Sequence, residues 1–310
     1  MDETAIRHET IAANGVTLHV ARLGRGRPLV LLHGWPEFWL TWEPVMRRLA
    51  DRFELIAPDL RGFGASEKPD ADPSDKAGAE VHAADILALL DALGLARAGL
   101  VGHDVGASVL QALARAAPER LTGLFTFNCP YPGIGPRLAA PDRLAEIWYQ
   151  SYHVTPFAAA QVGASREGCR LYIGHFLRHW AGGNPAAFDA DLDAFVDNFL
   201  APGNLQGGFN WYVSSQAGRL AMIRGEAPRL PPIAVPACVR WGDSDPLFPY
   251  AWTDRLGETF SDLDLAPLAG VGHFPHREDP DHAAAEIARF FERLPGSGGF
   301  GVMGSHWRDD

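Results

Sequence analysis

The sequence has few cysteines, no surplus of positive charge and no long apolar run. Its three cysteines, Cys129, Cys169 and Cys238, are far apart and odd in number, so we interpret them as reduced thiols, not as disulfides or metal ligands. The net charge is −11, which argues against nucleic acid and anionic membranes as partners. No stretch approaches the ~20 apolar residues of a membrane helix. Because the first residues also lack the features of a signal peptide, we expect a cytoplasmic protein.

Apolar runs and amphipathic segments alternate through the first 130 residues or so. Strand-like runs lie at residues 15–22, 28–33, 54–58, 98–101 and 121–128, and helical spacing of apolar residues lies at 43–52 and 81–93. The first run alternates as an edge strand does, whereas the other four are mostly apolar, as in strands buried on both faces. This order of elements predicts a parallel sheet with crossover helices.

The pattern changes between residues 132 and 232, where helix-like segments rich in aromatic residues are separated by Gly, Pro and Asn turns. Strand-like runs then resume at 235–241 and 263–267, and a closing amphipathic helix is predicted at 281–294. The predicted organisation is a core domain of residues 1–131 and 233–295, a helical cap at 132–232 and a flexible tail at 296–310.

One aspartate stands where a strand is followed at once by a helix, in the segment Gly102-His103-Asp104-Val105-Gly106. A nucleophile flanked in this way by small residues lies on a sharp turn that presents its side chain above the sheet edge. A carboxylate at that position displaces a leaving group from an sp3 carbon and becomes an ester, which water must then cleave. The alternative is that Asp104 only caps the following helix.

A second turn is predicted to lie beside this aspartate. The segment Leu32-His33-Gly34-Trp35-Pro36 directly follows a buried strand. We expect its Trp35 amide, together with the Val105 amide, to form an oxyanion hole.

A base and a supporting acid follow later in the chain. His273 lies on a loop between the last strand and the closing helix, and Asp245 follows the strand at 235–241. A lone histidine is more often a polar loop residue, but nucleophile, acid and base in this chain order favour a catalytic role. We expect Asp245 to orient His273, with Asp243 as the alternative.

The motifs HGWP, DLRGFGAS, GHDVG, GDSDP and GHFPHREDP together resemble those of the α/β-hydrolase superfamily, in its Asp-nucleophile branch of epoxide hydrolases, haloalkane dehalogenases and fluoroacetate dehalogenases. The resemblance covers about residues 10–295. It implies an α/β-hydrolase fold, with a mostly parallel sheet flanked by helices and an inserted helical cap. It also implies Asp104 as nucleophile and His273 as the base that activates water, with no metal or organic cofactor.

The resemblance also bears on the supporting acid, which in this family follows either the sixth or the seventh strand. The residue at the sixth-strand position is Asn128, which cannot serve as an anion. Asp245 is therefore preferred as the acid.

Two departures from the family patterns favour an epoxide as substrate. The pair of arginines by which fluoroacetate dehalogenases hold a carboxylate has no counterpart, since the first arginine after the nucleophile is Arg115. The residue directly after the nucleophile is Val105, not the tryptophan that usually holds halide in haloalkane dehalogenases. Epoxide hydrolases supply two cap tyrosines to the leaving oxygen, and the segments of Tyr149 and Tyr212 resemble them.

Several aromatic residues are candidates for the substrate pocket, although each is also typical of core packing. Tyr152 is in addition the alternative to Tyr149. The candidates are Phe38, Trp39, Tyr152, Phe157, Trp180 and Phe209.

The predicted activity is hydrolysis of a small-molecule epoxide by water to a vicinal diol. A dehalogenase with the same machinery is the first alternative, and a catalytically silent ligand-binding homologue is the second. The long cap is compatible with a homodimer, and the sequence leaves this open.

Overall fold

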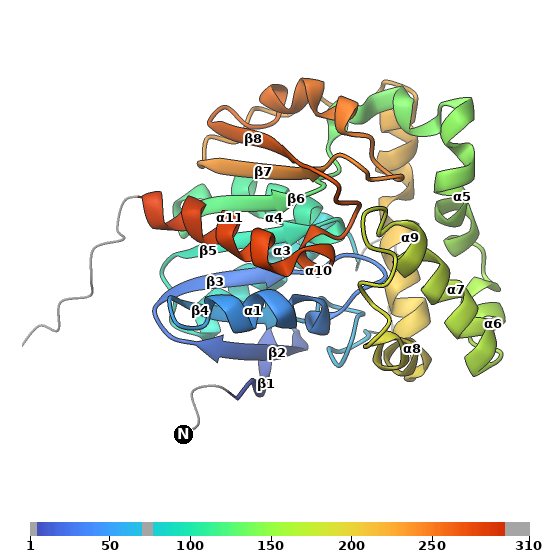
Figure 1. Ribbon diagram of the computed structural model, residues 1–310, viewed down its shortest axis with the longest axis horizontal. Helices are drawn as coiled ribbons and strands as arrows, with labels where there is room; N and C mark the ends of the chain where they lie inside the picture. Colours follow the sequence, from blue (N-terminus) through green and yellow to red (C-terminus); the bar gives the residue numbers. More distant parts are fainter. Residues whose placement is uncertain (1–4, 70–76, 295–310) are drawn as a thin grey trace, which may run out of the picture.

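The computed structural model describes residues 5–69 and 77–294, which form an eight-stranded sheet with helices on both faces (Figure 1). The sheet order is β1-β2-β4-β3-β5-β6-β7-β8. Only the β1–β2 and β2–β4 pairs are antiparallel, which confirms a mostly parallel sheet. The strands are β1 (Arg7–Ala13), β2 (Val16–Gly24), β3 (Arg27–Leu32), β4 (Phe53–Pro58), β5 (Ala98–His103), β6 (Leu121–Phe127), β7 (Ala237–Gly242) and β8 (Leu263–Leu268).

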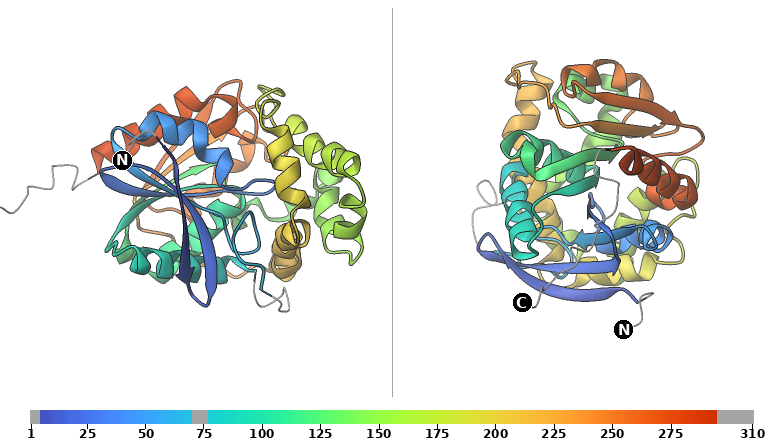
Figure 2. Two further views of the ribbon diagram at one scale, coloured as in Figure 1. Left: turned by 90° about the horizontal axis from the view of Figure 1, so that it is seen from below. Right: turned by 90° about the vertical axis from the view of Figure 1, so that its left-hand side faces the viewer.

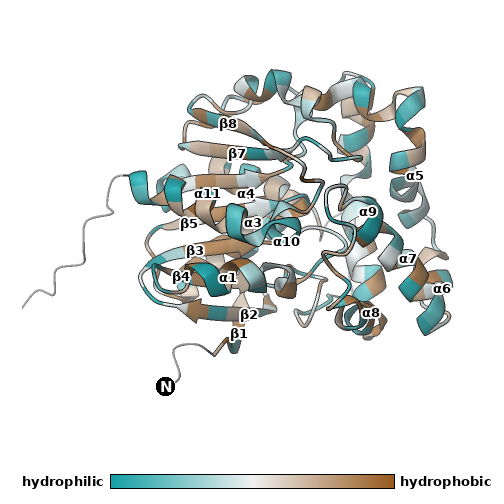
Figure 3. Cartoon of the chain, in the orientation of Figure 1, coloured by the Kyte–Doolittle hydropathy of each residue, from teal (hydrophilic) through white to brown (hydrophobic). Residues whose placement is uncertain are grey.

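Helices cover the two faces of the sheet because each carries one apolar stripe. Figure 2 shows α1 (Glu43–Leu49) and α11 (Pro280–Arg293) on one face, and α3 (Ala79–Ala92) and α4 (Val105–Ala116) on the other. In α11 the buried residues recur at helical spacing: Ala283, Ala284, Ile287, Ala288, Phe290 and Phe291. Figure 3 shows that strands β3 and β5 between these layers are mainly hydrophobic.

A block of helices is inserted between β6 and β7 and lies at one end of the sheet (Figure 1). This confirms the predicted helical insertion. Its helices are α5 (Leu144–His153), α6 (Ala158–Val162), α7 (Arg166–His179), α8 (Leu192–Leu200) and α9 (Asn204–Ile223). We keep the name cap for this block. Within the described residues, no helix has both the length and the apolar character needed to cross a membrane.

The predicted edge position of the strand at 15–22 was wrong. That run is β2, and β1 pairs with it on the outer side from Arg7↔Arg22 to Ala13↔Val16. Most of β1 is exposed or half-buried, so its sequence carries no clear apolar alternation by which it could be recognised. The predicted tail at 296–310 lies outside the described residues.

Ile287 offers a test of how much α11 contributes to the fold. Its side chain is fully buried between α11 and the sheet, so Ile287→Ala removes buried methyl groups and leaves a cavity. We expect the free energy of unfolding, measured in urea, to fall by about 2–5 kcal/mol. The control is Arg289→Ala on the exposed face of the same helix, for which a change within about 0.5 kcal/mol is expected. Equal losses in the two variants would contradict this packing.

Candidate active site

Asp104 lies on the sharp turn between β5 and α4. Its φ is 48° and its ψ is −113°, a conformation that costs a non-glycine residue about 1–3 kcal/mol. The turn is tight because the backbone packs closely against β3: a Cβ on Gly106 would collide with the carbonyl oxygen of Leu32. The Asp104 side chain makes no capping hydrogen bond to α4, so the helix-cap alternative does not describe it.

One oxygen of Asp104 is held by the backbone of the neighbouring turn. The Trp35 N–H donates to Asp104 Oδ1 at 3.0 Å, and the peptide bond between Trp35 and Pro36 is cis. Val105 is the first residue of α4, so its amide is among those that have no acceptor inside the helix. Both amides predicted for an oxyanion hole thus lie at Asp104: the Trp35 amide donates to its side chain, and the Val105 amide belongs to the next residue in the chain.

His273 lies between two buried carboxylates. Its Nε2 is 3.8 Å from Asp104 Oδ2, and its Nδ1 is 2.8 Å from Asp245 Oδ2. The other Asp245 oxygen accepts the amides of Leu247 and Phe248 at 2.7 and 3.1 Å. The structure therefore brings together the three residues predicted as nucleophile, base and acid.

Asp243, the alternative acid, lies elsewhere. Its side chain is exposed and accepts the Gly270 amide at 2.8 Å. It closes a surface turn and does not contact His273.

The charges of this triad are strongly coupled. Burial acts to lower the pKa of His273, but the Asp245 and Asp104 carboxylates outweigh burial and raise that pKa to about 10. Burial acts to raise the pKa of Asp104, and the nearby charge of His273 together with the Trp35 amide outweighs it, so the pKa lies below its usual value. At neutral pH the site therefore holds an imidazolium between two carboxylates.

Asn128 ties the acid to two strands, a role that the sequence did not reveal. Its side-chain amide donates to Asp245 Oδ2 at 2.5 Å and to the Gly272 carbonyl at 3.1 Å. Its oxygen accepts the Gly242 amide at 3.1 Å. Its place at the end of the sixth strand was the available sign of this role, but the sequence predicted only that Asn128 cannot be the anion beside His273.

Tyr149 and Tyr212 enter from the cap and meet at Trp35. The rings of Trp35 and Tyr149 are stacked 5.4 Å apart, and Tyr212 lies edge-on to Trp35 at 5.8 Å. The two tyrosine rings are 5.5 Å apart and both are buried. Burial and the nearby charge of Asp104 raise the pKa of Tyr149, and burial, Tyr149 and Asp104 raise that of Tyr212. Both phenols are therefore neutral proton donors.

Two of the predicted pocket aromatics belong to the same cluster. The Trp180 ring lies 5.3 Å from His273 and 5.9 Å from Trp35. Phe209 lies 6.4 Å from Trp35. Both side chains are fully buried, so they form part of the apolar surroundings of Trp35 and, for Trp180, of His273.

The other four predicted pocket residues make no ring contact with Trp35 or the triad within residues 5–69 and 77–294. Tyr152 and Phe157 lie toward the outside of the cap, whereas Phe38 and Trp39 follow the Trp35 turn. Their substrate-binding role stays a prediction. Their contacts are Phe38 with Phe195 (5.1 Å), Trp39 with His8 (4.8 Å), Tyr152 Oη with Gln161 Oε1 (2.7 Å) and Phe157 with Tyr152 (6.1 Å).

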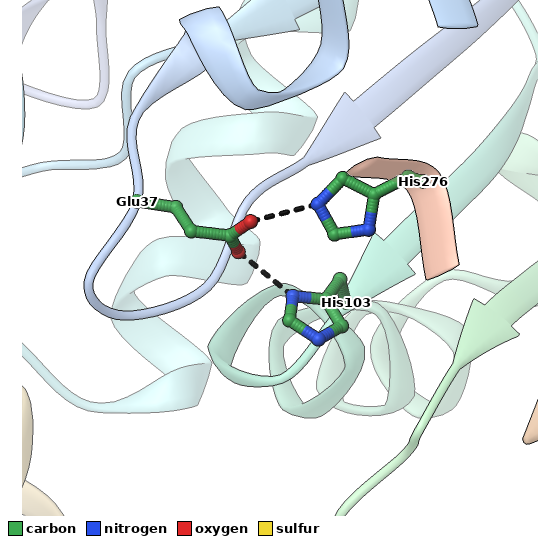
Figure 4. Close-up of side chains that lie close together, drawn as sticks. All are labelled: Glu37, His103 and His276. Atoms are coloured by element: carbon green, nitrogen blue, oxygen red, sulfur yellow. Dashed lines mark hydrogen bonds and ion pairs between the residues drawn. The ribbon is translucent and has the colours of Figure 1, made fainter. Parts of the chain in front are cut away.

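Another buried carboxylate, Glu37, lies between two histidines, one of which, His103, directly precedes Asp104 in the sequence (Figure 4). Its oxygens are 2.7 Å from His103 Nδ1 and 2.7 Å from His276 Nε2. Two ligands of one tetrahedral zinc ion would be about 3.4 Å apart, so these distances describe hydrogen bonds and not a preformed metal centre. Burial acts to raise the pKa of Glu37, but His103 and His276 outweigh it and hold that pKa well below its usual value.

This network reaches the backbone of His273. His103 Nε2 donates to the backbone carbonyl of His273 at 2.7 Å. In the sequence, His103 stands out only as part of the turn around Asp104, and neither Glu37 nor His276 was predicted to belong to the site. The position of His103 directly before Asp104 was the available signal.

The family model for the α/β-hydrolase fold matches residues 27–280. The soluble epoxide hydrolase of Corynebacterium sp. (strain C12) is 30% identical over 300 residues, which cover 94% of this chain and 99% of the relative. Epoxide hydrolase A of Mycobacterium tuberculosis is 30% identical over 321 residues, covering 92% and 97%. The structure of the epoxide hydrolase CorEH without ligand has a TM-score of 0.75 and 26% identity, covering 93% of this chain and 99% of that one.

The coupling between His273 and Asp104 predicts a pH titration. In the protein with its imidazoles isotopically labelled, the NMR signal of His273 is expected to titrate near pH 10. Asp104→Asn removes one of the two anions that raise the pKa, so the midpoint should move down toward the ordinary value of about 6.5. By linkage, the raised pKa contributes stability below pH 6.5, and that contribution is lost as pH rises through about 10.

The control for this titration is Asp254→Asn, which removes an exposed carboxylate that pairs with Arg137. It should leave the His273 midpoint where it is in the unaltered protein. An unchanged midpoint in Asp104→Asn would show that Asp104 does not set the charge of the base.

Proposed function

Because this chain belongs to the α/β-hydrolase family and is similar to epoxide hydrolases, we propose that it hydrolyses a small-molecule epoxide to a vicinal diol through an ester on Asp104. The observation that supports an epoxide most directly is the pair of buried neutral phenols, Tyr149 and Tyr212, which pack on Trp35. The Trp35 amide in turn holds Asp104. An opening epoxide ring needs proton donors close to the nucleophile, because its oxygen leaves as an alkoxide that remains on the substrate.

In the first step Asp104 attacks a ring carbon. Its Oδ1 is occupied by the Trp35 amide, so Oδ2 is the attacking atom. The C–Oδ2 bond forms as the ring C–O bond breaks, and the leaving oxygen takes a proton from Tyr149 or Tyr212. The products are a hydroxyalkyl ester and a tyrosinate, which the proton of the His273 imidazolium neutralises.

In the second step water cleaves the ester. Esterification removes the charge of Asp104, which with Asp245 had raised the pKa of His273, so the imidazole that gave up its proton in the first step acts as a base. It takes a proton from water, the resulting hydroxide adds to the ester carbonyl, and the Trp35 and Val105 amides hold the oxyanion. Collapse releases the diol with the carboxyl proton and restores the Asp104 carboxylate and the imidazolium.

Asp245 keeps Nδ1 of His273 as the donor, so that Nε2 faces the reacting water. Trp180 and Phe209 are proposed to line the apolar part of the site. The mechanism uses no metal or organic cofactor. A cytoplasmic location and a homodimer stay predictions.

Substrate class is tested by a parallel assay of styrene oxide, fluoroacetate and a short haloalkane, with diol and halide release as readouts. We expect diol from styrene oxide and no halide. Asp104→Asn should lower diol formation by at least about 10⁴-fold, as loss of a covalent nucleophile does. The exposed-site variant Asp281→Asn is the control and should retain the activity.

A single turnover in H2¹⁸O tests the ester directly. The label should enter the peptide that contains Asp104, because water attacks the ester carbonyl, and the first diol should carry unlabelled oxygen. Halide release without diol would show that the substrate is a halogenated compound and not an epoxide. Full activity of Asp104→Asn, with deamidation excluded by mass, would sink the covalent mechanism.

The roles of the tyrosines are tested by the double variant Tyr149→Phe with Tyr212→Phe. Removing both proton donors should slow ring opening by about 100-fold or more, while the rate of ester hydrolysis after opening changes little. Rapid-quench measurement of ester formation separates the two steps. The control is Tyr250→Phe, which removes a phenol from η5 (Tyr250–Glu258), outside the cluster. Unchanged ring opening in the double variant would remove the role assigned to the pair.

A further inference from the structure

The carboxylate of Glu278, the last residue of α10 (Pro275–Glu278), accepts backbone amides from two separate loops. Its Oε2 accepts the amides of Gly183, Asn184 and Gly272 at 2.9, 3.2 and 2.8 Å. Its Oε1 accepts the Phe274 amide at 2.9 Å. One side chain thus holds the cap loop that follows α7 and both neighbours of His273.

The two loops also meet backbone to backbone. The His273 amide donates to the Trp180 carbonyl of the cap at 2.8 Å. A Cβ on Gly272 would collide with that carbonyl and with the Gly182 amide, and a Cβ on Gly183 would collide with the Gly270 carbonyl. The loops therefore lie too close for intervening side chains, and a small displacement of one displaces the other.

We propose that Glu278 is a positioning residue for the base: it clasps the cap loop to the His273 loop and so sets where His273 stands relative to the Asp104 ester. The inference rests on the proposed function, because it concerns the hydrolysis step. Its physical basis is the anionic carboxylate, which has enough acceptor sites for all four amides. A neutral amide of the same shape has one accepting oxygen, and its NH2 group would face at least one N–H donor.

The two chemical steps depend on this clasp differently. Ring opening uses Asp104 and the tyrosines, and the His273 proton is needed only once the ring has opened, whereas ester cleavage needs water placed between His273 Nε2 and the ester carbonyl. A shift of the His273 loop therefore affects ester cleavage far more than ester formation. A carboxylate that only stabilised the fold would affect both steps alike.

The test compares Glu278→Gln with the matched control Asp281→Asn, which removes an exposed carboxylate three residues later. Styrene oxide is mixed with excess enzyme, the reaction is quenched in acid, and the ester is followed by intact-protein mass. In Glu278→Gln we expect ester decay to slow by about tenfold or more, with ester formation within about twofold of the unaltered protein. The ester should accumulate in this variant and not in Asp281→Asn.

Hydrogen exchange provides a readout that needs no substrate. Exchange at residues 181–184 of the cap and at 271–274 should accelerate together in Glu278→Gln, because one carboxylate protects both loops. Glu278→Asp keeps the charge and should partly restore ester decay and protection. If Glu278→Gln does not fold, Glu278→Asp is compared with the unaltered protein in its place.

Equal slowing of both steps, or unchanged ester decay with unchanged exchange, would overturn the proposal. So would faster exchange in only one of the loops. An unaltered protein that forms neither ester nor diol would refute the proposed function, and the exchange result would then still decide whether the clasp exists.

Discussion

The structure depends on burying three ionisable groups, Asp104, His273 and Asp245, in one place. An isolated buried carboxylate or imidazolium costs several kcal/mol of solvation, so such groups persist only when each faces an opposite charge or a donor. His273 faces both carboxylates. Because Asp104 directly follows β5 and Asp245 follows β7, this requirement holds the carboxyl ends of these two strands at the same edge of the sheet, with β6 between them.

The partners beyond the triad follow from the same requirement. Asn128 shares Asp245 Oδ2 with His273, and the amides of Leu247 and Phe248 occupy the other oxygen, Oδ1. The backbone of His273 is held from the core side through its carbonyl, by His103, and from the cap side through its amide, by Trp180. His273 therefore lies where the cap meets the core, and its position depends on how these two parts pack against each other.

The features that depend on local sequence could be predicted, whereas those that depend on contacts between distant segments could not. The turn at Asp104, the buried strands and the closing helix are local patterns, and the order of Asp104, Asp245 and His273 along the chain suggested their meeting. The edge strand β1 has no apolar pattern, because it is exposed on most of its length. Glu278 reaches the cap amides, and Glu37 reaches His103 and His276, only through tertiary packing. Tertiary packing also decides that Trp180 is buried in the aromatic cluster whereas Phe157 is 56% exposed, although the sequence offered both as pocket residues.

The coupling of charges also orders the proposed reaction. Asp245 and the anionic Asp104 raise the pKa of His273 and favour its protonated form, which in the proposed reaction does not activate water. Esterification removes that anion, and the same imidazole then becomes a base. The tyrosines differ from His273 in that burial and the charge of Asp104 both favour their neutral form. In the proposed reaction they keep their protons until an alkoxide develops beside them. In the proposed reaction, Asp104 thus acts first as nucleophile and then, because its ester carries no charge, allows His273 to act as a base.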